Sequence, residues 1–181
     1  MKTTILSEDT IFENKAVATI GFFDGVHRGH QFLLKHVVDL AHENDMESMA
    51  ITFDKHPRQV LNADYQPQLL STLDDKLKLL AETGIDHCVV LPFTKVLAAL
   101  SAYDFMDKIM RTKLGVAKLL IGYDNRFGHN RSETFDDYVR YGKEMGIEVV
   151  QNTALDVEGI MVSSSVVRRL ISNGDVETAA K

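Results

Sequence analysis

The 181-residue sequence lacks the features on which several common kinds of protein depend. Cys88 is its single cysteine, so it has neither a disulfide framework nor a cysteine-based metal site. Because Cys88 lies in an apolar run, we expect a buried and unreactive thiol. No stretch approaches the roughly 20 apolar residues that a membrane-spanning helix needs. The first residues turn acidic too soon for a secretory signal peptide, so we expect a cytoplasmic protein that does not associate with membranes.

An excess of basic charge is also missing. The chain has 26 Asp and Glu residues against 20 Lys and Arg residues, which gives a net charge of −6. This balance argues against a protein that coats nucleic acid through bulk electrostatic attraction. An anion would instead be bound by local groups, such as helix N-termini, backbone amides and a few basic side chains. The chain has no internal repeat, and its composition and length are typical of one α/β domain.

Short apolar runs alternate with amphipathic segments along the chain. The runs predicted to be strands are residues 17–20, 49–53, 88–91, 119–121 and 148–150. They alternate little in polarity, as expected for strands buried on both faces. The predicted helices are residues 31–44, 73–83, 101–115, 134–145 and 164–173. Such alternation predicts a parallel sheet covered by helices on both faces, with ligands bound beyond the carboxyl ends of its strands.

Residues 21–30, with the sequence Gly-Phe-Phe-Asp-Gly-Val-His-Arg-Gly-His, follow the first predicted strand and lead into a helix. The three glycines allow a tight backbone and a close approach by a ligand. The spacing of these glycines does not fit a dinucleotide-binding fingerprint, and the segment does not have the ending of a Walker A loop. His27 and His30 share one face once the helix begins. Zinc would need further ligands, and the other histidines are scattered; two solvated histidines at a helix start are the plain alternative.

A run of serines, Ser163-Ser164-Ser165, precedes the last predicted helix, and Arg168 follows about one turn later. A serine is a good N-cap, so a capped helix is the plain interpretation. Hydroxyls, backbone amides, the helix dipole and a guanidinium together also form a cradle for an anion. Because a cap needs only one of the three serines, we expect the others to serve a bound anion.

Two more segments directly follow predicted strands. Residues 121–128 are typical of a turn, or else Asp124 holds a hydroxyl or a metal and Arg126 or Arg131 holds an anion. Residues 52–58 combine an aromatic side chain, basic side chains and a proline. That composition suits a phosphorylated ring compound and equally suits a plain loop.

Together, these segments resemble the nucleotidylyltransferase superfamily. His27-Arg28-Gly29-His30 matches its HxGH signature, and residues 163–168 resemble its S-S-T-x-I-R signature, with serine for threonine and valine for isoleucine. Three segments are specific to a smaller group of proteins: the longer sequence at residues 21–30, the F-D-x-H-P loop and the G-Y-D-x-R-F-G loop. They are similar to the FMN adenylyltransferase module of the prokaryotic bifunctional riboflavin kinase/FAD synthetase family, from about residue 15 to the end of the chain.

The resemblance implies a Rossmann-like nucleotidylyltransferase fold with a five-stranded parallel sheet, forming one domain over residues 1–181. It implies transfer of the adenylyl group of ATP to FMN, which gives FAD and pyrophosphate, with Mg²⁺ carried mainly by the ATP phosphates. The catalytic residues that it implies are His27, His30 and Arg168. The ATP-binding residues that it implies are Gly21, Phe22, Phe23, Asp24, Gly29, Asp124, Ser163, Ser164 and Ser165. Those for FMN are Phe53, His56, Pro57 and Arg126.

The chain also departs from the family pattern. Asn125 stands where the family usually has an aromatic residue, which puts a stacking contact there in doubt. The riboflavin kinase module that usually follows is missing, and residues 175–181 resemble a helix just begun, so we expect a truncated chain without kinase activity. Three alternatives remain open: a related enzyme with another phosphate acceptor, a non-catalytic nucleotide- or flavin-binding regulator, and a metal-binding module.

Overall fold

The computed structural model describes residues 1–62, 64, 66, 68–122, 125–129, 131–153, 155–157 and 160–180. Within these residues the centre is a six-stranded sheet with the order β1-β4-β3-β2-β5-β6, in which every neighbouring pair is parallel. The strands are β1 Lys2–Ile5, β2 Ala16–Ile20, β3 Glu47–Phe53, β4 His87–Leu91, β5 Val116–Ile121 and β6 Glu148–Gln151. The predicted parallel sheet is confirmed, and all five predicted strands are present.

The predicted count of five strands is wrong by one, because β1 was not expected. Its sequence, Lys-Thr-Thr-Ile, contains no apolar run, and three of its four residues are exposed. It pairs only with β4, at the edge of the sheet, where burial on both faces is not required.

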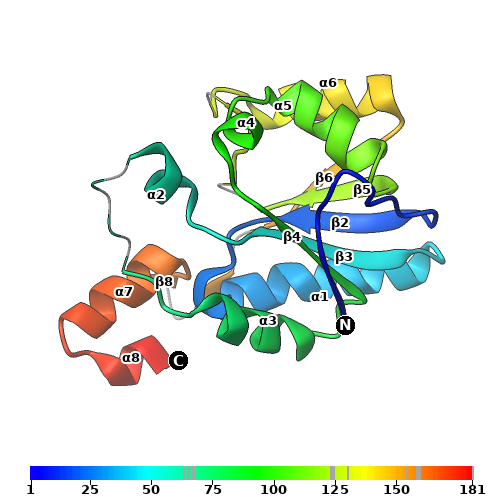
Figure 1. The fold of residues 1–181 in the computed structure, drawn as a ribbon. Coiled ribbons are helices and arrows are strands. Elements are labelled where there is room, and N and C mark those ends of the chain that lie inside the picture. The colour runs from blue at the N-terminus through cyan, green and yellow to red at the C-terminus, as the bar shows by residue number, and fades with distance from the viewer. Residues whose placement is uncertain are drawn as a thin grey trace.

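Helices cover both faces of the sheet (Figure 1). One face carries α1 Arg28–Glu43 and α3 Leu73–Ala81. The other carries α4 Lys95–Ala98, α5 Ala102–Phe105, η2 Met106–Arg111 and α6 Phe135–Met145. The predicted helix over residues 101–115 is thus a short α-helix followed by the π-helical segment η2.

Strand β2 shows why the strands have continuous apolar sequences. All five of its residues are buried. Ala16, Ala18 and Ile20 belong to the core beneath α5, η2 and α6, whereas Val17 belongs to the core beneath α1 and α3. Because alternate residues of a strand point to opposite faces, a strand between two cores is apolar at most positions; in β2 the exception is the buried Thr19.

Helix boundaries follow local capping chemistry. Thr72 begins α3 by accepting a hydrogen bond from the backbone N–H of Asp75, as a capping box predicts. Thr134 and Asp137 form the corresponding reciprocal pair at the start of α6. Gly146 ends α6 with a φ of 77°, a left-handed conformation that glycine adopts without steric cost.

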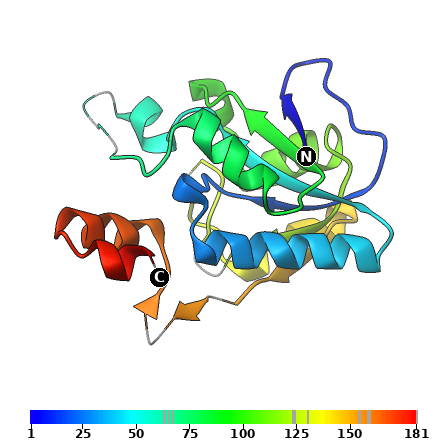
Figure 2. The ribbon, with the colours of Figure 1, turned by 90° about the horizontal axis from the view of Figure 1, so that it is seen from below.

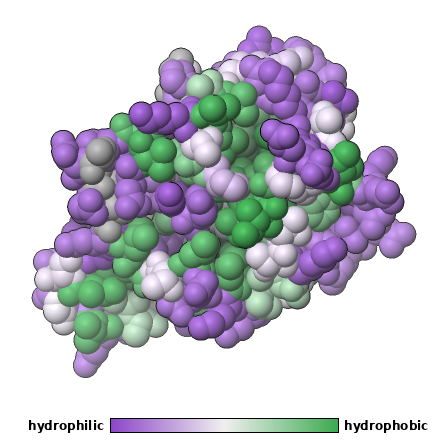
Figure 3. Space-filling model, viewed as in Figure 1, coloured by the Kyte–Doolittle hydropathy of each residue, from purple (hydrophilic) through white to green (hydrophobic). Residues whose placement is uncertain are grey.

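The remaining elements lie beyond the carboxyl ends of the strands. They are η1 Asp24–Val26, α2 Pro57–Leu61, the hairpin of β7 Asp156–Val157 and β8 Ile160–Met161, α7 Ser164–Ser172 and α8 Val176–Ala180. Figure 2 shows that α7, α8 and the hairpin project from the body of the domain. Hydrophobic side chains gather over α7 and α8 and over the middle of the face seen in Figure 3, with Ile171 and Val176 both exposed.

Candidate active site

The order of the strands places a candidate site beyond the end of β2. From β2 the chain moves outward through β3 and β4, and it returns to the opposite side of β2 to form β5 and β6. A parallel sheet binds ligands where its connections diverge in this way, outside the carboxyl ends of the strands. Residues 21–30 follow β2, residues 54–58 follow β3, residues 125–129 come after β5, and residues 163–168 begin α7.

The loop after β2 has a strained backbone. Phe23, Gly25 and Val26 have φ angles of 54°, 71° and 40°. Such angles are uncommon outside glycine, and they are least favourable for a β-branched residue such as Val26. Phe23 and Val26 are both buried, so packing beneath the loop holds this conformation. The strain lets the chain turn sharply from β2 into α1.

His27 and His30 meet at the start of α1. His27 is the N-cap residue, and its Nδ1 accepts a hydrogen bond from the His30 backbone N–H at 3.4 Å. A neutral His27 ring therefore carries its proton on Nε2, where it can act as a donor. The two rings are stacked with centroids 3.7 Å apart, and Phe23 packs edge-on against His30 at 5.2 Å.

His30 is held in its neutral form. Burial lowers its pKa well below 6.5, and the charges of His27 and Lys76 lower it further. Its Nδ1 is buried and has no hydrogen-bond partner among the described residues. His30 thus offers a hydrogen-bonding ring, but it does not offer a positive charge at neutral pH.

Gly29 lies between the two histidines, where a side chain has little room. A Cβ atom at this position would lie 3.2 Å from the His27 ring and 3.2 Å from the carbonyl oxygen of Val162. Glycine therefore allows the segment before α7 to approach the start of α1.

The buried carboxylate of Asp24 connects separate segments of the site. Its side chain is only 2% exposed and accepts hydrogen bonds from the backbone N–H groups of Leu70 and Ser71 at 2.9 and 3.2 Å. Arg168 donates to the same carboxylate at 3.0 Å, which joins the start of α7 to the loop after β2. Asp24 was predicted to bind ATP, but its carboxylate is occupied by protein partners.

The three consecutive serines have three different environments. Ser163 caps α7 by accepting a hydrogen bond from the Val166 backbone N–H at 3.3 Å. The Ser164 hydroxyl donates to the backbone carbonyl of Asp24 at 3.3 Å. Ser165 is exposed and lines a cavity together with Arg168.

That cavity, of about 350 Å³, joins several of the predicted segments. Its wall includes the following predicted residues: Gly21, Phe22, Phe53, His56, Pro57, Arg126, Ser165 and Arg168. Arg131, predicted as an alternative to Arg126 for holding an anion, also lies in the wall, as do residues outside the predicted set, among them Phe93, Leu97, Phe127 and Arg58. Phe23, Asp24, His27, Gly29, His30, Ser163 and Ser164 lie outside its lining. Asp124 falls outside the described residues.

Aromatic contacts shape the part of the cavity that follows β3. Phe53 packs edge-on against Phe93 with ring centroids 5.2 Å apart, and Phe22 packs against His56 at 4.9 Å. His56 caps α2 through Nδ1, which accepts from the Arg58 backbone N–H at 3.2 Å. Burial lowers the pKa of His56, and the nearby guanidinium groups of Arg168 and Arg58 lower it further.

Asn125 uses its amide in place of an aromatic contact. Its side-chain N–H donates to the backbone carbonyl of Ile20, at the end of β2. Its backbone N–H donates to the carbonyl of Gly122 at 3.0 Å. Asn125 therefore ties the loop after β5 to the end of β2.

Lys76 is the main residue of the site that the sequence prediction missed. It is only 3% exposed, and its ammonium donates to the carbonyls of Phe22 and Phe53 at 3.1 and 2.9 Å. A signal was present in the sequence, because Lys76 falls between Leu73 and Leu80 on the apolar face of its helix. A lysine at such a position is buried with partners or reaches the surface along its alkyl chain.

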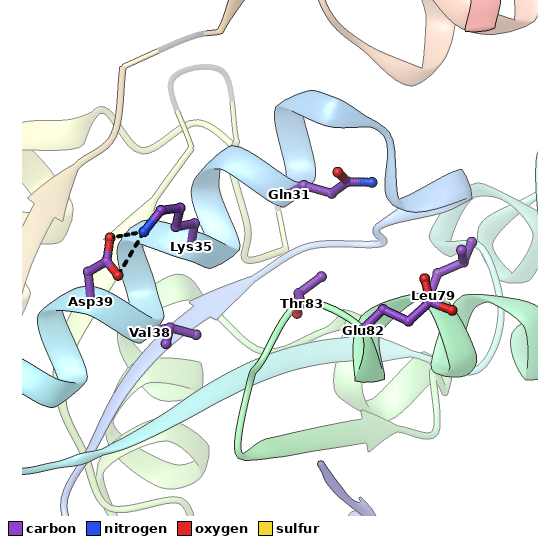
Figure 4. A pocket seen from close by; sticks show the side chains of 7 residues that line it. All are labelled: Gln31, Lys35, Val38, Asp39, Leu79, Glu82 and Thr83. Carbon is purple, nitrogen blue, oxygen red and sulfur yellow. Dashed lines mark hydrogen bonds and ion pairs between the residues drawn. The ribbon is translucent and has the colours of Figure 1, made fainter. Parts of the chain in front are cut away.

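A second hollow, of about 430 Å³, lies between α1 and α3 (Figure 4). Its lining is Gln31, Lys35, Val38, Asp39, Leu79, Glu82 and Thr83. Lys35 and Asp39 form an ion pair with each other at 2.7 Å. None of the predicted site residues lies in this lining, so the cavity at the carboxyl edge of the sheet is the candidate active site.

Two other features are absent from the part of the chain that the structure describes. No helix in this part of the chain is long and apolar enough to cross a membrane. No three His, Cys, Asp or Glu side chains among the same residues come together as ligands for a metal ion.

Solved structures of differently named proteins have the same fold as this chain. A crystal structure of a macrolide-efflux protein from Streptococcus pneumoniae matches 98% of this chain and 58% of that chain, with a TM-score of 0.84 and 24% identity. A pantoate-beta-alanine ligase from Francisella tularensis, crystallised with beta-gamma ATP and beta-alanine, matches 96% of this chain and 70% of that chain, with a TM-score of 0.55 and 13% identity. These similarities establish the fold alone.

Sequence comparisons are more specific. The bifunctional riboflavin kinase/FMN adenylyltransferases of Escherichia coli K12 and Pseudomonas fluorescens are 32% and 34% identical to this chain over 163 and 165 residues. The matches cover 90% and 91% of this chain but 52% and 53% of the relatives, so the chain spans about half their length. A profile of the FAD synthetase family matches residues 9–166. Because this match covers most of the 181 residues, the chain belongs to the FAD synthetase family.

Proposed function

We propose that the protein transfers the adenylyl group of ATP to FMN, giving FAD and pyrophosphate. Membership of the FAD synthetase family and the names of the relatives support this activity. The structural observation that carries the proposal is the cavity at the carboxyl edge of the sheet. It joins Gly21 and Phe22 of the loop after β2 to Phe53 at the end of β3 and His56 beyond it, with Arg168 also in its wall.

We assign the phosphates of ATP to the start of α1 and the start of α7. The first turn of α1 supplies backbone N–H groups and the positive end of a 16-residue helix dipole. His27 and His30 add hydrogen-bonding rings, and Arg168 can retain its contact with Asp24 while its other N–H groups face an anion. Ser165, in the cavity wall, adds a hydroxyl.

We assign the flavin to the aromatic part of the cavity. Phe53, Phe93 and Phe127 contribute apolar ring surface, and Arg58 and Arg126 contribute positive charge near it. A phosphorylated ring compound needs both kinds of surface, because its ring is apolar and its phosphate is anionic.

The reaction itself needs no general base. The second pKa of a phosphate monoester is about 6, so near pH 7 FMN already has a dianionic phosphate. One of its oxygens attacks the α-phosphorus of ATP, a new P–O bond forms, and the bond from the α-phosphorus to the bridging oxygen breaks. Pyrophosphate leaves with that electron pair, and no proton has to be moved. The protein then contributes by aligning the two reactants and stabilising charge on the phosphate oxygens.

The proposal includes Mg²⁺ as an ion bound to the phosphates of ATP. Among the described residues there is no cluster of carboxylates suited to the ion, and the Asp24 carboxylate is engaged by Leu70, Ser71 and Arg168. These residues do not form a magnesium site by themselves. In nucleotide enzymes Mg²⁺ is commonly held by one or two carboxylates together with substrate phosphates.

The test is to measure pyrophosphate release and FAD formation with ATP, FMN and Mg²⁺. Both products should appear together, and omission of either substrate should abolish them. Pyrophosphate formed from another phosphate acceptor but not from FMN would reject FMN as the acceptor. Tight ATP binding without pyrophosphate release under any condition would reject catalysis and favour a regulator.

A further inference from the structure

Lys76 is a buried cation beside the candidate site, and its ammonium donates three hydrogen bonds to residues of β3 and of the loop after β2. Its Nζ donates to the carbonyl oxygens of Phe22 and Phe53, at 3.1 and 2.9 Å, and to the Thr52 hydroxyl at 3.2 Å. An ammonium has three N–H donors, so each donor has an acceptor within the described residues. Burial of a charge is unfavourable unless such partners are present. The lysine is therefore fixed in one geometry.

The partners of Lys76 lie on two different segments of the site, the loop after β2 and the end of β3. Phe22 follows β2 on the side that we assign to ATP, and Phe53 ends β3 on the side that we assign to FMN. Thr52 strengthens the connection, because its hydroxyl donates to the Phe22 carbonyl at 3.1 Å. The ammonium also lies 4.1 Å from the centroid of the Phe22 ring, which is part of the cavity wall.

We propose that Lys76 is a positioning residue for adenylyl transfer, which holds the loop after β2, assigned to ATP, and the end of β3, assigned to FMN, at a fixed separation through Phe22 and Phe53. This inference rests on the proposed function. In-line attack requires the reacting atoms to lie about 3–3.5 Å apart, so a small change in this separation lowers the rate of transfer. Binding of either substrate to its own loop changes less, so the effect falls on kcat.

Several titratable groups surround the ammonium. They are Asp24 in the loop after β2, Asp54 after β3, Cys88 on β4 and His30 on α1. Burial lowers the pKa of Lys76 to about 8, although interactions with Cys88, Asp24 and Asp54 act in the opposite direction. Loss of the proton leaves an amine with two N–H donors for three acceptors. The connection between the loops should therefore weaken as the pH rises through this range.

Lys76→Met tests the proposal, because methionine is similar in length and makes none of the three hydrogen bonds. We expect kcat for FAD formation to fall by about tenfold or more, with the KM values for ATP and FMN within about threefold of the wild type. Lys78→Met is the matched control, since Lys78 is exposed on the same helix and pairs with Asp75. It should keep kcat within about twofold of the wild type. A folded Lys76→Met protein with wild-type kcat would overturn the proposal.

The pH profile of the wild-type protein is a second test, which does not depend on the variant folding. We expect kcat to fall with an apparent pKa of about 8 as the pH rises from 7 to about 9.5. This decrease should be missing in Lys76→Met and retained in Lys78→Met. A wild-type kcat that is constant across this range would contradict the proposal.

A titration of His30 by NMR separates failure of this inference from failure of the proposed function. The charge of Lys76 lowers the pKa of His30, so Lys76→Met should raise it and Lys78→Met should leave it unchanged. If the wild type forms no FAD under any condition, the proposed function is wrong, and the titration still reports whether Lys76 acts on the histidine pair. An unchanged His30 pKa in Lys76→Met would show that it does not.

Discussion

The carboxylate of Asp24 and the guanidinium of Arg168 lie 3.0 Å apart, although 144 positions separate them in the sequence. Asp24 is almost fully buried, whereas the Arg168 side chain is 29% exposed and reaches the cavity wall. The buried partner therefore fixes the direction of a cation that is assigned to the phosphates of ATP. Two motifs from opposite ends of the chain are joined by this contact into one site.

Asp24→Asn should weaken both the fold and the site. Asparagine keeps the shape but removes the charge that accepts from Leu70, Ser71 and Arg168. We expect the free energy of unfolding to fall by about 1–3 kcal/mol, the usual cost of leaving such buried groups poorly satisfied. The KM for ATP should rise, because Arg168 is no longer held in place. Urea unfolding and steady-state kinetics would measure the two effects.

The control for this prediction is Asp39→Asn, which removes an exposed ion pair with Lys35. Surface pairs of this kind contribute about 0–1 kcal/mol, so little change in stability is expected. Equal effects of the two substitutions would show that the Asp24 contact has no special structural role.

His30→Ala should lower activity more than stability. We expect kcat to fall by about 10²-fold, the usual cost of losing a hydrogen-bond donor to a transition state. Loss of the ring removes its packing against His27 and Phe23, so some stability is lost, but no hydrogen bond of its Nδ1 to the described residues is broken. His42→Ala, at an exposed position on the same helix, is the matched control. Full activity in a folded His30→Ala protein would exclude a role for His30 in the reaction.

Local sequence was sufficient to predict the parts of the fold that depend on local physics. The central strands have mainly apolar sequences because both of their faces are buried, and this pattern is visible without a structure. Strand β1 has a polar sequence and pairs only at the edge, so no such pattern marks it. The helix caps were predictable for the same reason, since a cap involves neighbours three residues apart.

The internal connections of the site were not predictable in this way. The HxGH and serine motifs led to a prediction of phosphate-binding residues, but not to the finding that Asp24 is occupied by Arg168. That pairing depends on how α7 packs beside the loop after β2. The position of Lys76 on the apolar face of α3 is visible in the sequence, but its partners, the carbonyls of Phe22 and Phe53 and the hydroxyl of Thr52, have no sequence signature. Such contacts become visible only in three dimensions.

The stability of the protein should depend on pH through its histidines. Burial lowers the pKa values of His30 and His56 below their ordinary value of 6.5. At a pH between the folded and unfolded pKa values, the unfolded chain binds more protons, so the free energy of unfolding falls as the pH decreases below about 6.5. Urea unfolding between about pH 7.5 and 5 would measure this. The double variant His30→Gln/His56→Gln should show a flatter dependence; an unchanged slope would assign the effect to other groups.

Substitutions of the three serines should have different effects, because each serine has a different environment. Ser163→Ala removes the N-cap of α7, so amide hydrogen exchange in this helix should accelerate by about fivefold, equivalent to about 1 kcal/mol. Ser165→Ala removes an exposed hydroxyl from the cavity wall, so it should raise the KM for ATP without changing exchange in α7. Equal acceleration of exchange in both variants would contradict this division of roles. Unchanged kinetics in Ser165→Ala would remove that hydroxyl from the proposed ATP site.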